Sequence, residues 1–171
     1  MNTTLFGTLR FGYGETRFGL VLMAASERGV AAILLGDDQP RLRRELARAF
    51  PDAALIEDEA GLAETLATVV ALIDHPGAGP AQTLDLTGSA IEMAVWQALR
   101  EIPVGETRSY GEVAKALPVT ATAQEVGAAC AANVLAVAVP CHRVLKADGS
   151  ISGYRWGVHR KRRLLAMEQA A

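Results

Sequence analysis

The sequence of 171 residues predicts two domains, an α/β N-terminal domain over residues 1–80 and a mainly α-helical C-terminal domain over residues 81–171. Three observations lead to this prediction. Apolar runs of strand length, separated by turns that contain glycine, occupy the first 35 residues. Apolar residues at helical spacing dominate from residue 89 onward. Between the two regions, residues 75–80 read His-Pro-Gly-Ala-Gly-Pro, a composition typical of a linker.

The N-terminal domain is expected to contain a three-stranded antiparallel sheet followed by helices. Its strands are predicted at residues 4–11, 19–25 and 29–35. A helix begins near Pro40 and is stopped by Pro51, because proline is tolerated at the first turn of a helix but not in its interior. A second helix is predicted at residues 61–73, where leucines and valines recur at helical spacing.

Helices are expected through most of the C-terminal domain. Ser89 followed by Glu92 forms a capping-box pattern at the start of the first helix. Ser109 caps a short helix at residues 110–117, and Thr120 or Thr122 begins another that runs to about residue 132. Two helices joined by a brief turn resemble a helix-turn-helix, although most such pairs serve only packing. An apolar strand is predicted at residues 134–139, ending at Pro140.

The most informative local pattern is a thiol followed directly by an imidazole, Cys141 and His142, just after this apolar stretch. A thiolate is the reactive form of cysteine, and polar or cationic neighbours lower its pKa from about 8.5. The pattern indicates a positioned nucleophile, but alone it is weak because free cysteines are often simply buried. Cys130 is interpreted in that second way, as a small buried hydrophobe. Neither cysteine belongs to a disulfide framework or a Cys-x-x-Cys metal pattern.

Charge is distributed unevenly along the chain. The net charge is −2, which argues against a general polyanion binder. Residues 1–80 carry 7 Lys+Arg against 11 Asp+Glu, whereas residues 141–171 carry 7 against 2. Any surface that faces phosphate therefore belongs to the second half. The basic run at residues 160–163 fits a solvated helix face equally well. The sequence shows no secretory signal and no apolar run of transmembrane length.

The motif Pro140-Cys141-His142-Arg143, together with segments upstream and downstream, resembles the O6-alkylguanine-DNA alkyltransferase family, and most closely its Ada-type branch. The motif is highly specific, and the matching segments extend over nearly the whole chain. They are residues 26–29, 35–38, 95–100, 102–110, 130–133, 140–144, 148–158, 160–161, 164–165 and 168. The resemblance implies a ribonuclease H-like N-terminal domain and a winged helix-turn-helix-like DNA-binding motif in the C-terminal domain.

The same resemblance implies direct reversal of DNA damage. A methyl or other alkyl group on O6 of guanine, and also on O4 of thymine, would pass irreversibly to Cys141, once per protein molecule. His142 would act as base through a bound water, and Glu168 would orient it. Tyr110 would donate toward the guanine, and Asn133 would brace the turn before Cys141. Without the motif, Glu168 and Tyr110 would be an ordinary terminal carboxylate and an ordinary aromatic.

Further residues follow from the resemblance. Arg143 is expected in a buried structural ion pair, and the base pocket is expected to be lined by Val144, Tyr154, Arg155 and Trp156. Lys161 would lie near Tyr110, although a surface lysine is an equally good interpretation. The expected DNA contacts are Arg108, Ser109, Thr122 and Gln124. The target nucleotide must be flipped out of the duplex, and Gln124 stands where most members carry an arginine wedge.

Several departures from the family pattern modify these expectations. Gln124 adds no charge, and Met93 and Ala94 stand where a basic residue often precedes Trp96, so weak DNA binding is expected. Trp156 replaces a small glycine of benzyl-sensitive members and Ala136 replaces a proline, which favours methyl over benzyl groups. No metal site and no cofactor are expected. The expected partner is double-stranded DNA containing O6-alkylguanine. The protein is expected to be a monomer, located in the bacterial cytoplasm or nucleoid and not associated with a membrane.

Two other functions compete with this one. A lesion-recognition module would flip alkylated guanine without repairing it, but relatives of that kind lack the cysteine. A Cys-His hydrolase would turn over, but the sequence carries no oxyanion-hole motif. Methylation of a packed sulfur is also expected to loosen the fold, because it overfills its surroundings.

Overall fold

The structure, a computed structural model, describes residues 7–77 and 82–170 and divides into two compact units, Met1–Asp85 and Leu86–Ala171. Residues 4–6 of the first predicted strand lie outside the described residues. So do residues 78–80 of the predicted linker and the predicted boundary between residues 80 and 81.

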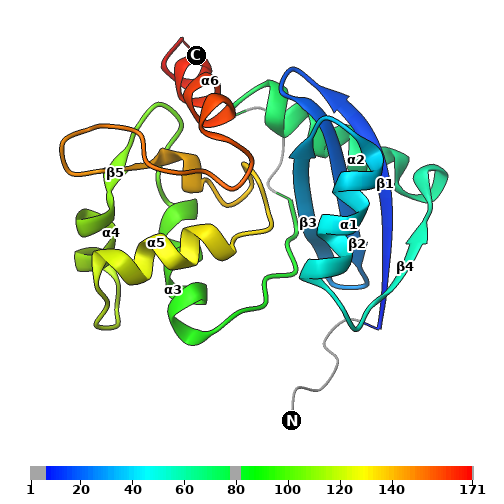
Figure 1. The fold of residues 1–171 in the computed structure, drawn as a ribbon, viewed down its shortest axis with the longest axis horizontal. Coiled ribbons are helices and arrows are strands. Elements are labelled where there is room, and N and C mark those ends of the chain that lie inside the picture. Colours follow the sequence, from blue (N-terminus) through cyan, green and yellow to red (C-terminus); the bar gives the residue numbers. More distant parts are fainter. Residues whose placement is uncertain (1–6, 78–81, 171) are drawn as a thin grey trace. The chain divides into compact units, whose positions relative to one another are not determined.

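The first unit contains a mixed sheet, whose strand order among the described residues is β3 (Gly29–Gly36), β2 (Gly19–Ser26), β1 (Thr8–Thr16) and β4 (Ala54–Glu57) (Figure 1). Strand β1 pairs antiparallel with β2 and parallel with β4, and β2 pairs antiparallel with β3. The elements of this unit are β1 (Thr8–Thr16), β2 (Gly19–Ser26), β3 (Gly29–Gly36), α1 (Gln39–Ala49), β4 (Ala54–Glu57) and α2 (Glu59–Asp74). The sequence therefore predicted this unit's α/β class and both helices correctly, but it missed β4. That strand is short, mostly exposed and without a clear apolar alternation.

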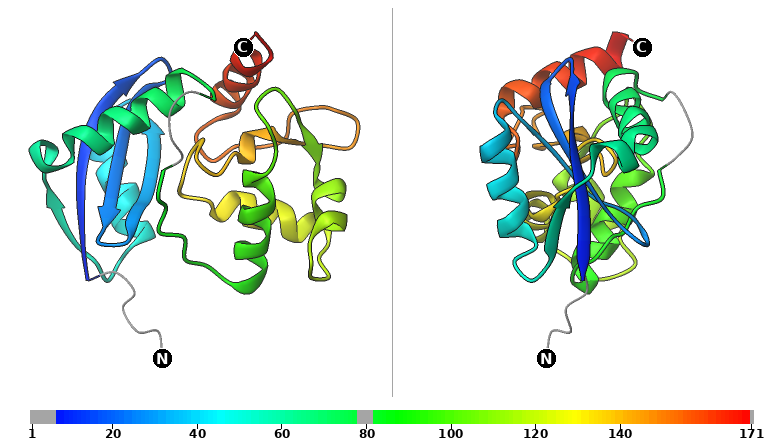
Figure 2. Two further views of the ribbon diagram at one scale, coloured as in Figure 1. Left: turned by 180° about the vertical axis from the view of Figure 1, so that it is seen from behind. Right: turned by 90° about the vertical axis from the view of Figure 1, so that its right-hand side faces the viewer.

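The two helices cover opposite faces of the sheet (Figure 2). The guanidinium of Arg43 in α1 lies 5.7 Å from the centre of the Phe11 ring on one face of β1. On the other face, a Cβ atom added to Gly14 would lie 3.1 Å from Val70 in α2. Glycine thus lets α2 approach the strand. Strand β1 pairs with β2 as far as Thr16, opposite Gly19, whereas the sequence analysis ended it at residue 11 because of its glycines.

The chain leaves the first unit along β3, whose outer edge is thereby covered. Backbone bonds join Val30 N to Thr83 O (2.9 Å) and Asp85 N to Val30 O (2.8 Å). The Ser26 hydroxyl also donates to the Asp85 carboxylate at 2.5 Å. A paired edge removes a site at which sheets aggregate.

The second unit is mainly helical, as predicted. It contains α3 (Ala90–Arg100), β5 (Arg108–Ser109), α4 (Tyr110–Ala116), α5 (Ala123–Ala132), the 3-10 turn η1 (Cys141–Arg143), β6 (Val144–Leu145) and α6 (Val158–Ala170). Helix α5 contacts both α3 and α4 (Figure 1). The Trp96 indole of α3 donates to Ala129 O of α5 at 2.9 Å, so the contact is polar as well as apolar.

Capping boxes begin α3, α4 and α5 at Ser89, Ser109 and Thr122. The cap of α5 is therefore Thr122, one of the two residues that the sequence left open. A short parallel ladder joins β5 to β6, pairing Arg108 with Val144 and Ser109 with Leu145. Because this ladder ends where α4 begins, it brings Tyr110 close to the segment that follows Cys141.

Candidate active site

The segment before Cys141 is a turn, which corrects the predicted strand at residues 134–139. Residues 136–138 form a tight turn, closed by Val139 N donating to Leu135 O at 3.0 Å. Val137 adopts a φ of 67°, a conformation that β-branched residues rarely take and that costs about 1–3 kcal/mol. The run is apolar because the turn is buried, and burial alone does not distinguish a turn from a strand.

Asn133 holds this turn together and contacts the thiol. It ends α5, and its side chain is buried. The amide nitrogen donates to Val139 O at 3.0 Å and to Cys141 Sγ at 3.3 Å. The amide oxygen accepts from Leu135 N at 2.8 Å. One side chain therefore ties the end of the helix, the turn and the sulfur into one rigid assembly.

Cys141 is only 4% exposed, and burial raises the pKa of its thiol. The hydrogen bond from Asn133 and the charge of Lys161 act in the opposite direction without cancelling the effect of burial. The sulfur is consequently a protonated thiol at neutral pH. Any reaction as a nucleophile requires a group that removes this proton.

His142, Arg143 and Glu168 form a buried ion cluster beside the thiol. His142 Nε2 lies 2.6 Å from Glu168 Oε1. Arg143 donates from Nε and NH2 to the two carboxylate oxygens, both at 2.9 Å, and from NH1 to Ile102 O at 2.6 Å. The prediction of a buried ion pair for Arg143 is confirmed.

The cluster sets the protonation of its members. Although burial alone would raise it, the pKa of Glu168 falls to about 2, because His142 and Arg143 hydrogen-bond the carboxylate. Burial lowers the pKa of His142, against the opposing effect of Glu168. A neutral ring that donates from Nε2 to the carboxylate leaves Nδ1 as an acceptor. This buried Nδ1 has no hydrogen-bond partner among the described protein atoms.

The Cys141 thiol lies at the wall of a cavity of about 640 Å³, within the usual range for small-molecule sites. The cavity is formed by α4, α5 and the loop before α6. Its lining residues are Tyr110, Ala123, Gln124, Gly127, Cys130, Ala131, Cys141, Lys146, Ser152, Gly153, Tyr154 and Arg155. Five residues that the sequence analysis selected therefore meet at one cavity: Tyr110, Gln124, Cys141, Tyr154 and Arg155.

Cys130 departs from its expected role as a plain core residue. It is half-buried and lines the same cavity as Cys141. Burial and the nearby Cys141 raise the pKa of Cys130 to about 12. Cys130 therefore stays a protonated thiol at neutral pH and does not form the reactive thiolate. The structure thus brings two thiols to one cavity, neither of which ionises readily by itself.

Three other predicted pocket residues lie behind the cavity wall. Val144 is fully buried, and Trp156 packs edge-on against Tyr154 with ring centres 5.3 Å apart. Lys161 is 1% exposed, so it is no surface lysine. Its Nζ donates to Val144 O at 2.8 Å. Trp156 thus borders the cavity residue Tyr154, whose buried hydroxyl has no partner among the described protein atoms.

Of the four expected DNA contacts, two are helix caps and two are side chains exposed or half-exposed to solvent. The hydroxyls of Ser109 and Thr122 accept the backbone N–H groups of Glu112 and Glu125, so both serve as helix caps. Gln124 is exposed at the cavity on the first turn of α5. Arg108 is half-exposed and pairs with Glu106 at 3.2 Å.

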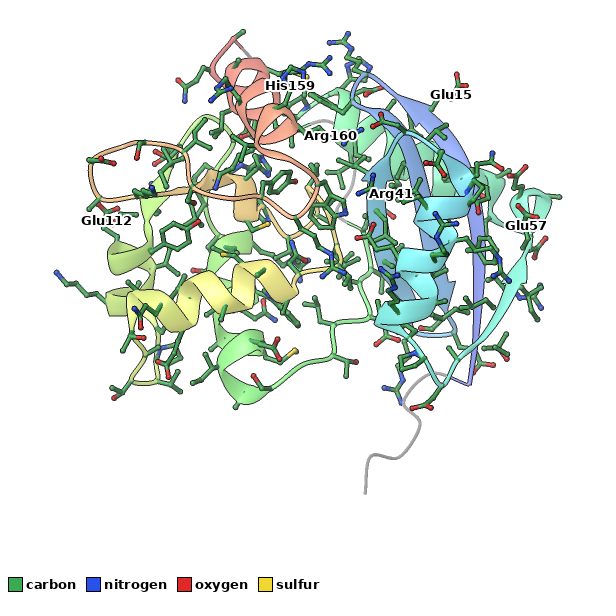
Figure 3. All side chains as sticks on the ribbon, in the orientation of Figure 1. Glu15, Arg41, Glu57, Glu112, His159 and Arg160 are labelled. Carbon is green, nitrogen blue, oxygen red and sulfur yellow. The ribbon has the colours of Figure 1, made fainter. Side chains whose placement is uncertain are left out.

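The basic run in α6 is not a uniform solvated face. Figure 3 labels His159 and Arg160 on the first turns of α6, where Arg160 donates to Trp156 O at 3.0 Å. Lys161 points inward, and residues 162–163 are exposed. In the part of the chain that the structure describes, no group of three His, Cys, Asp or Glu side chains is arranged to hold a metal ion. Within the same residues, no helix combines the length and the apolar character that crossing a bilayer requires.

Sequence reasoning assigned no role to several contributors to the site, three of which carry polar groups. Ser152 and Lys146 line the cavity, and Ile102 supplies the carbonyl that Arg143 binds. Ser152 and Lys146 lie on either side of Asp148-Gly149, a turn signal next to the motif, which could have marked the loop as part of the site. No sequence signal marks the carbonyl of Ile102.

Comparison with known proteins identifies relatives of this chain. Residues 90–170 match the family model described as the 6-O-methylguanine DNA methyltransferase, DNA binding domain. The chain is 43% identical to the bifunctional transcriptional activator/DNA repair enzyme Ada of Escherichia coli, over 94% of this chain and 45% of that protein. It is 32% identical to the inducible methylated-DNA–protein-cysteine methyltransferase of Bacillus subtilis, over 98% of this chain and 88% of that protein.

Solved structures give the same result. A crystal structure of Mycobacterium tuberculosis OGT in complex with DNA superposes with a TM-score of 0.77 at 30% identity, covering 94% of this chain and 93% of that one. The chain spans about half the length of the first curated relatives that it matches.

Proposed function

The chain belongs to the O6-methylguanine-DNA methyltransferase family, and from this premise we propose that it repairs DNA by moving an alkyl group from O6 of guanine to Cys141. O4 of alkylated thymine is a second substrate in this proposal. One observation carries it: the Cys141 thiol borders a cavity large enough to admit a base, and the next residue in the chain is hydrogen-bonded to the buried carboxylate of Glu168.

The first step is removal of the thiol proton. Because burial raises the pKa of Cys141, the thiolate must form as the substrate is engaged. We assign the base to His142, whose Nδ1 is free to accept the proton through a water. Glu168 then stabilises the protonated ring, while Arg143 keeps the carboxylate charged.

The second step is displacement at the alkyl carbon. The sulfur forms a new S–C bond while the O6–C bond breaks, and its electron pair stays on the guanine. Tyr110, which lines the same cavity, donates a proton toward the departing base. The product is a thioether, which no group of this site can cleave, so each molecule reacts once. Asn133 holds the sulfur in place throughout.

DNA recognition is assigned to residues 81–171, with α4 and α5 as a winged helix-turn-helix-like motif. The support is the capped helix pair and the match of residues 90–170 to a model described as a DNA binding domain. The target base would be flipped into the cavity, with Gln124 filling the gap. Arg108, Ser109 and Thr122 would contact the backbone, and Tyr154 and Arg155 the base. Val144, Trp156 and Lys161 would support the pocket from behind.

The remaining parts of the proposal concern the setting. Residues 1–80 form a ribonuclease H-like domain, and the protein acts as a monomer on double-stranded DNA containing O6-alkylguanine. We locate it in the bacterial cytoplasm, because a free thiol at Cys141 stays reduced there.

The function is tested by counting repaired bases. A duplex with one O6-methylguanine is supplied in tenfold excess, and restored guanine is measured by nucleoside chromatography. The proposal predicts a plateau at one guanine per protein molecule and none with Cys141→Ala. A continuing reaction would identify a hydrolase instead. Binding without any restored guanine would identify a lesion-recognition module.

A further inference from the structure

A buried ammonium lies behind the cavity, and its hydrogen bonds lead to one cavity residue. Lys161 is 1% exposed and lies in the second turn of α6. Besides Val144 O at 2.8 Å, its Nζ donates to Gly153 O at 3.4 Å and to Ser152 Oγ at 3.4 Å. An ammonium has three donors and no acceptor, so this environment uses all three.

Ser152 connects this ammonium to a phenol that lines the cavity, that of Tyr110. Its hydroxyl is hydrogen-bonded to the hydroxyl of Tyr110, which is 42 residues away in sequence and begins α4. Ser152, Tyr110 and Cys141 all line the same cavity. The three side chains Lys161, Ser152 and Tyr110, here called the polar chain, thus run from the protein interior to the site of reaction.

The donor-only end gives the polar chain a direction. Lys161 can only donate, so Ser152 Oγ accepts from it and keeps its own hydrogen free to donate to the oxygen of Tyr110. The hydrogen of Tyr110 is then free to point into the cavity. Without Ser152, the phenol hydrogen would lose this bias and could turn toward any other acceptor.

We propose that Ser152 is a positioning residue for alkyl transfer, which links Lys161 to Tyr110 and aims the Tyr110 hydroxyl as a donor at the departing guanine. This inference rests on the proposed function. When the O6–C bond breaks, guanine keeps the electron pair and takes a proton from Tyr110. Ser152 and Lys161 replace that proton along the polar chain. The proton of Cys141 ends on His142, and the proton that guanine gains is the one that Lys161 loses, so Lys161 becomes neutral as His142 becomes charged and the reaction is balanced.

The charges support this arrangement. Burial raises the pKa of Tyr110, and the hydrogen bond to Ser152 opposes that rise. Burial lowers the pKa of Lys161, which makes its ammonium a better proton donor than a solvated lysine. The hydrogen bond from Ser152 and the lowered pKa of Lys161 both help a proton to reach a leaving group that would otherwise depart as an anion, whereas the burial of Tyr110 acts against this transfer.

Single-turnover kinetics test the role of Ser152. Rates of methyl transfer from a saturating O6-methylguanine duplex are compared for wild type, Ser152→Ala, and the isosteric pair Ser152→Thr and Ser152→Val. A rate about tenfold lower for the alanine and valine variants is expected, with duplex affinity unchanged and with the threonine variant near wild type. Ser150→Ala is the control, because Ser150 lies in the same loop but bonds Asp148 at 2.6 Å instead.

A double-mutant cycle shows whether Ser152 acts through Tyr110. In a Tyr110→Phe background, Ser152→Ala is expected to cause no further loss of rate. Equal losses in both backgrounds would overturn the proposal, as would valine and threonine variants that react alike.

A measurement without substrate separates this inference from the proposed function. Titration of the tyrosine ring carbons by NMR is expected to show a higher pKa for Tyr110 in Ser152→Ala than in wild type, even if the protein transfers no alkyl group. An unchanged titration of Tyr110 would contradict the link. Absence of transfer by wild type would instead contradict the proposed function.

Discussion

At the scale of single residues, the carboxylate of Glu168 is a shared hydrogen-bond partner, since both His142 and Arg143 bind it. Replacing Glu168 by glutamine leaves the Arg143 guanidinium buried without a counter-charge. Breaking a buried pair in this way costs about 3–5 kcal/mol. We therefore expect Glu168→Gln to lower the free energy of unfolding by that amount in urea denaturation. The exposed Glu64→Gln is the control, and a Glu168→Gln variant as stable as this control would refute the account of the cluster.

The buried histidine predicts how stability depends on pH. Because burial lowers the pKa of His142 below its usual 6.5, the unfolded chain binds a proton at higher pH than the folded chain does. Stability is therefore complete above about pH 6.5 and declines as the pH falls. Glu168 acts in the same direction at lower pH, since its folded pKa is about 2 against an ordinary 4.5.

Urea unfolding at pH 8, 6.5 and 5.5 measures this dependence. In the His142→Gln variant, the free energy of unfolding should no longer decline between pH 6.5 and 5.5. The variant His159→Gln, at an exposed position, should show the same decline as the wild type. Stability that rises as the pH falls through this interval would contradict a neutral, buried ring.

The size of the alkyl group that the site accepts is also expected to depend on single residues. Trp156 packs against Tyr154, which lines the cavity, and so limits how far that ring can move. We expect faster transfer of methyl than of benzyl groups, and we expect Trp156→Leu to narrow the difference. Modification rates with the two substrates, measured side by side, check this. Faster benzyl transfer by the wild-type protein would be the contrary result.

At the scale of elements, α5 presents Gln124 at the cavity where charge would aid DNA binding. We expect Gln124→Arg to tighten duplex binding and to steepen its dependence on salt by about one phosphate contact. The change is measured by fluorescence anisotropy between 50 and 200 mM salt, concentrations over which such contacts weaken markedly. Gln39→Arg on α1 is the matched control, and an equal gain from it would indicate a nonspecific effect of charge.

Some helices, strands and turns could be predicted from the sequence, and others could not. The capping boxes at Ser89, Ser109 and Thr122 could be predicted because each depends on residues three apart. Strand β4 could not, because it is held by parallel pairing with a strand some 46 residues earlier, Thr8 with Ala54. The turn before Cys141 was mistaken for a strand because its geometry depends on the side chain of Asn133 rather than on its own apolar residues.

The residues of the candidate site also separate into those that the sequence could predict and those that it could not. A specific motif marked Cys141 and His142, and the resemblance added Glu168 from the far end of the chain. The polar chain could not be predicted, since nothing in the sequence reveals that Ser152 reaches Tyr110 or that Lys161 is buried. Such contacts come from the packing of α6 and its preceding loop around the motif.

At the scale of the whole molecule, reaction at Cys141 is expected to weaken the fold. Although its thiol borders the cavity, Cys141 is 4% exposed and its sulfur accepts a hydrogen bond from Asn133, so we expect an added methyl group to crowd the packed side of the site. Such overpacking costs about 1–3 kcal/mol, which for this size lowers the melting temperature by roughly 2–4 °C per kcal/mol. Calorimetry before and after treatment with methylated duplex measures the shift. A melting temperature that rises on methylation would contradict this expectation.

The central claim, that Cys141 receives the alkyl group, is tested most directly by mass spectrometry. The intact protein and its peptides are analysed after incubation with a duplex that contains O6-methylguanine. The account predicts one added methyl group per molecule, on the peptide with Cys141, with Cys130 unmodified and no gain in Cys141→Ala. A folded wild-type protein that binds the duplex but gains no mass, or gains it on another residue, would contradict the account.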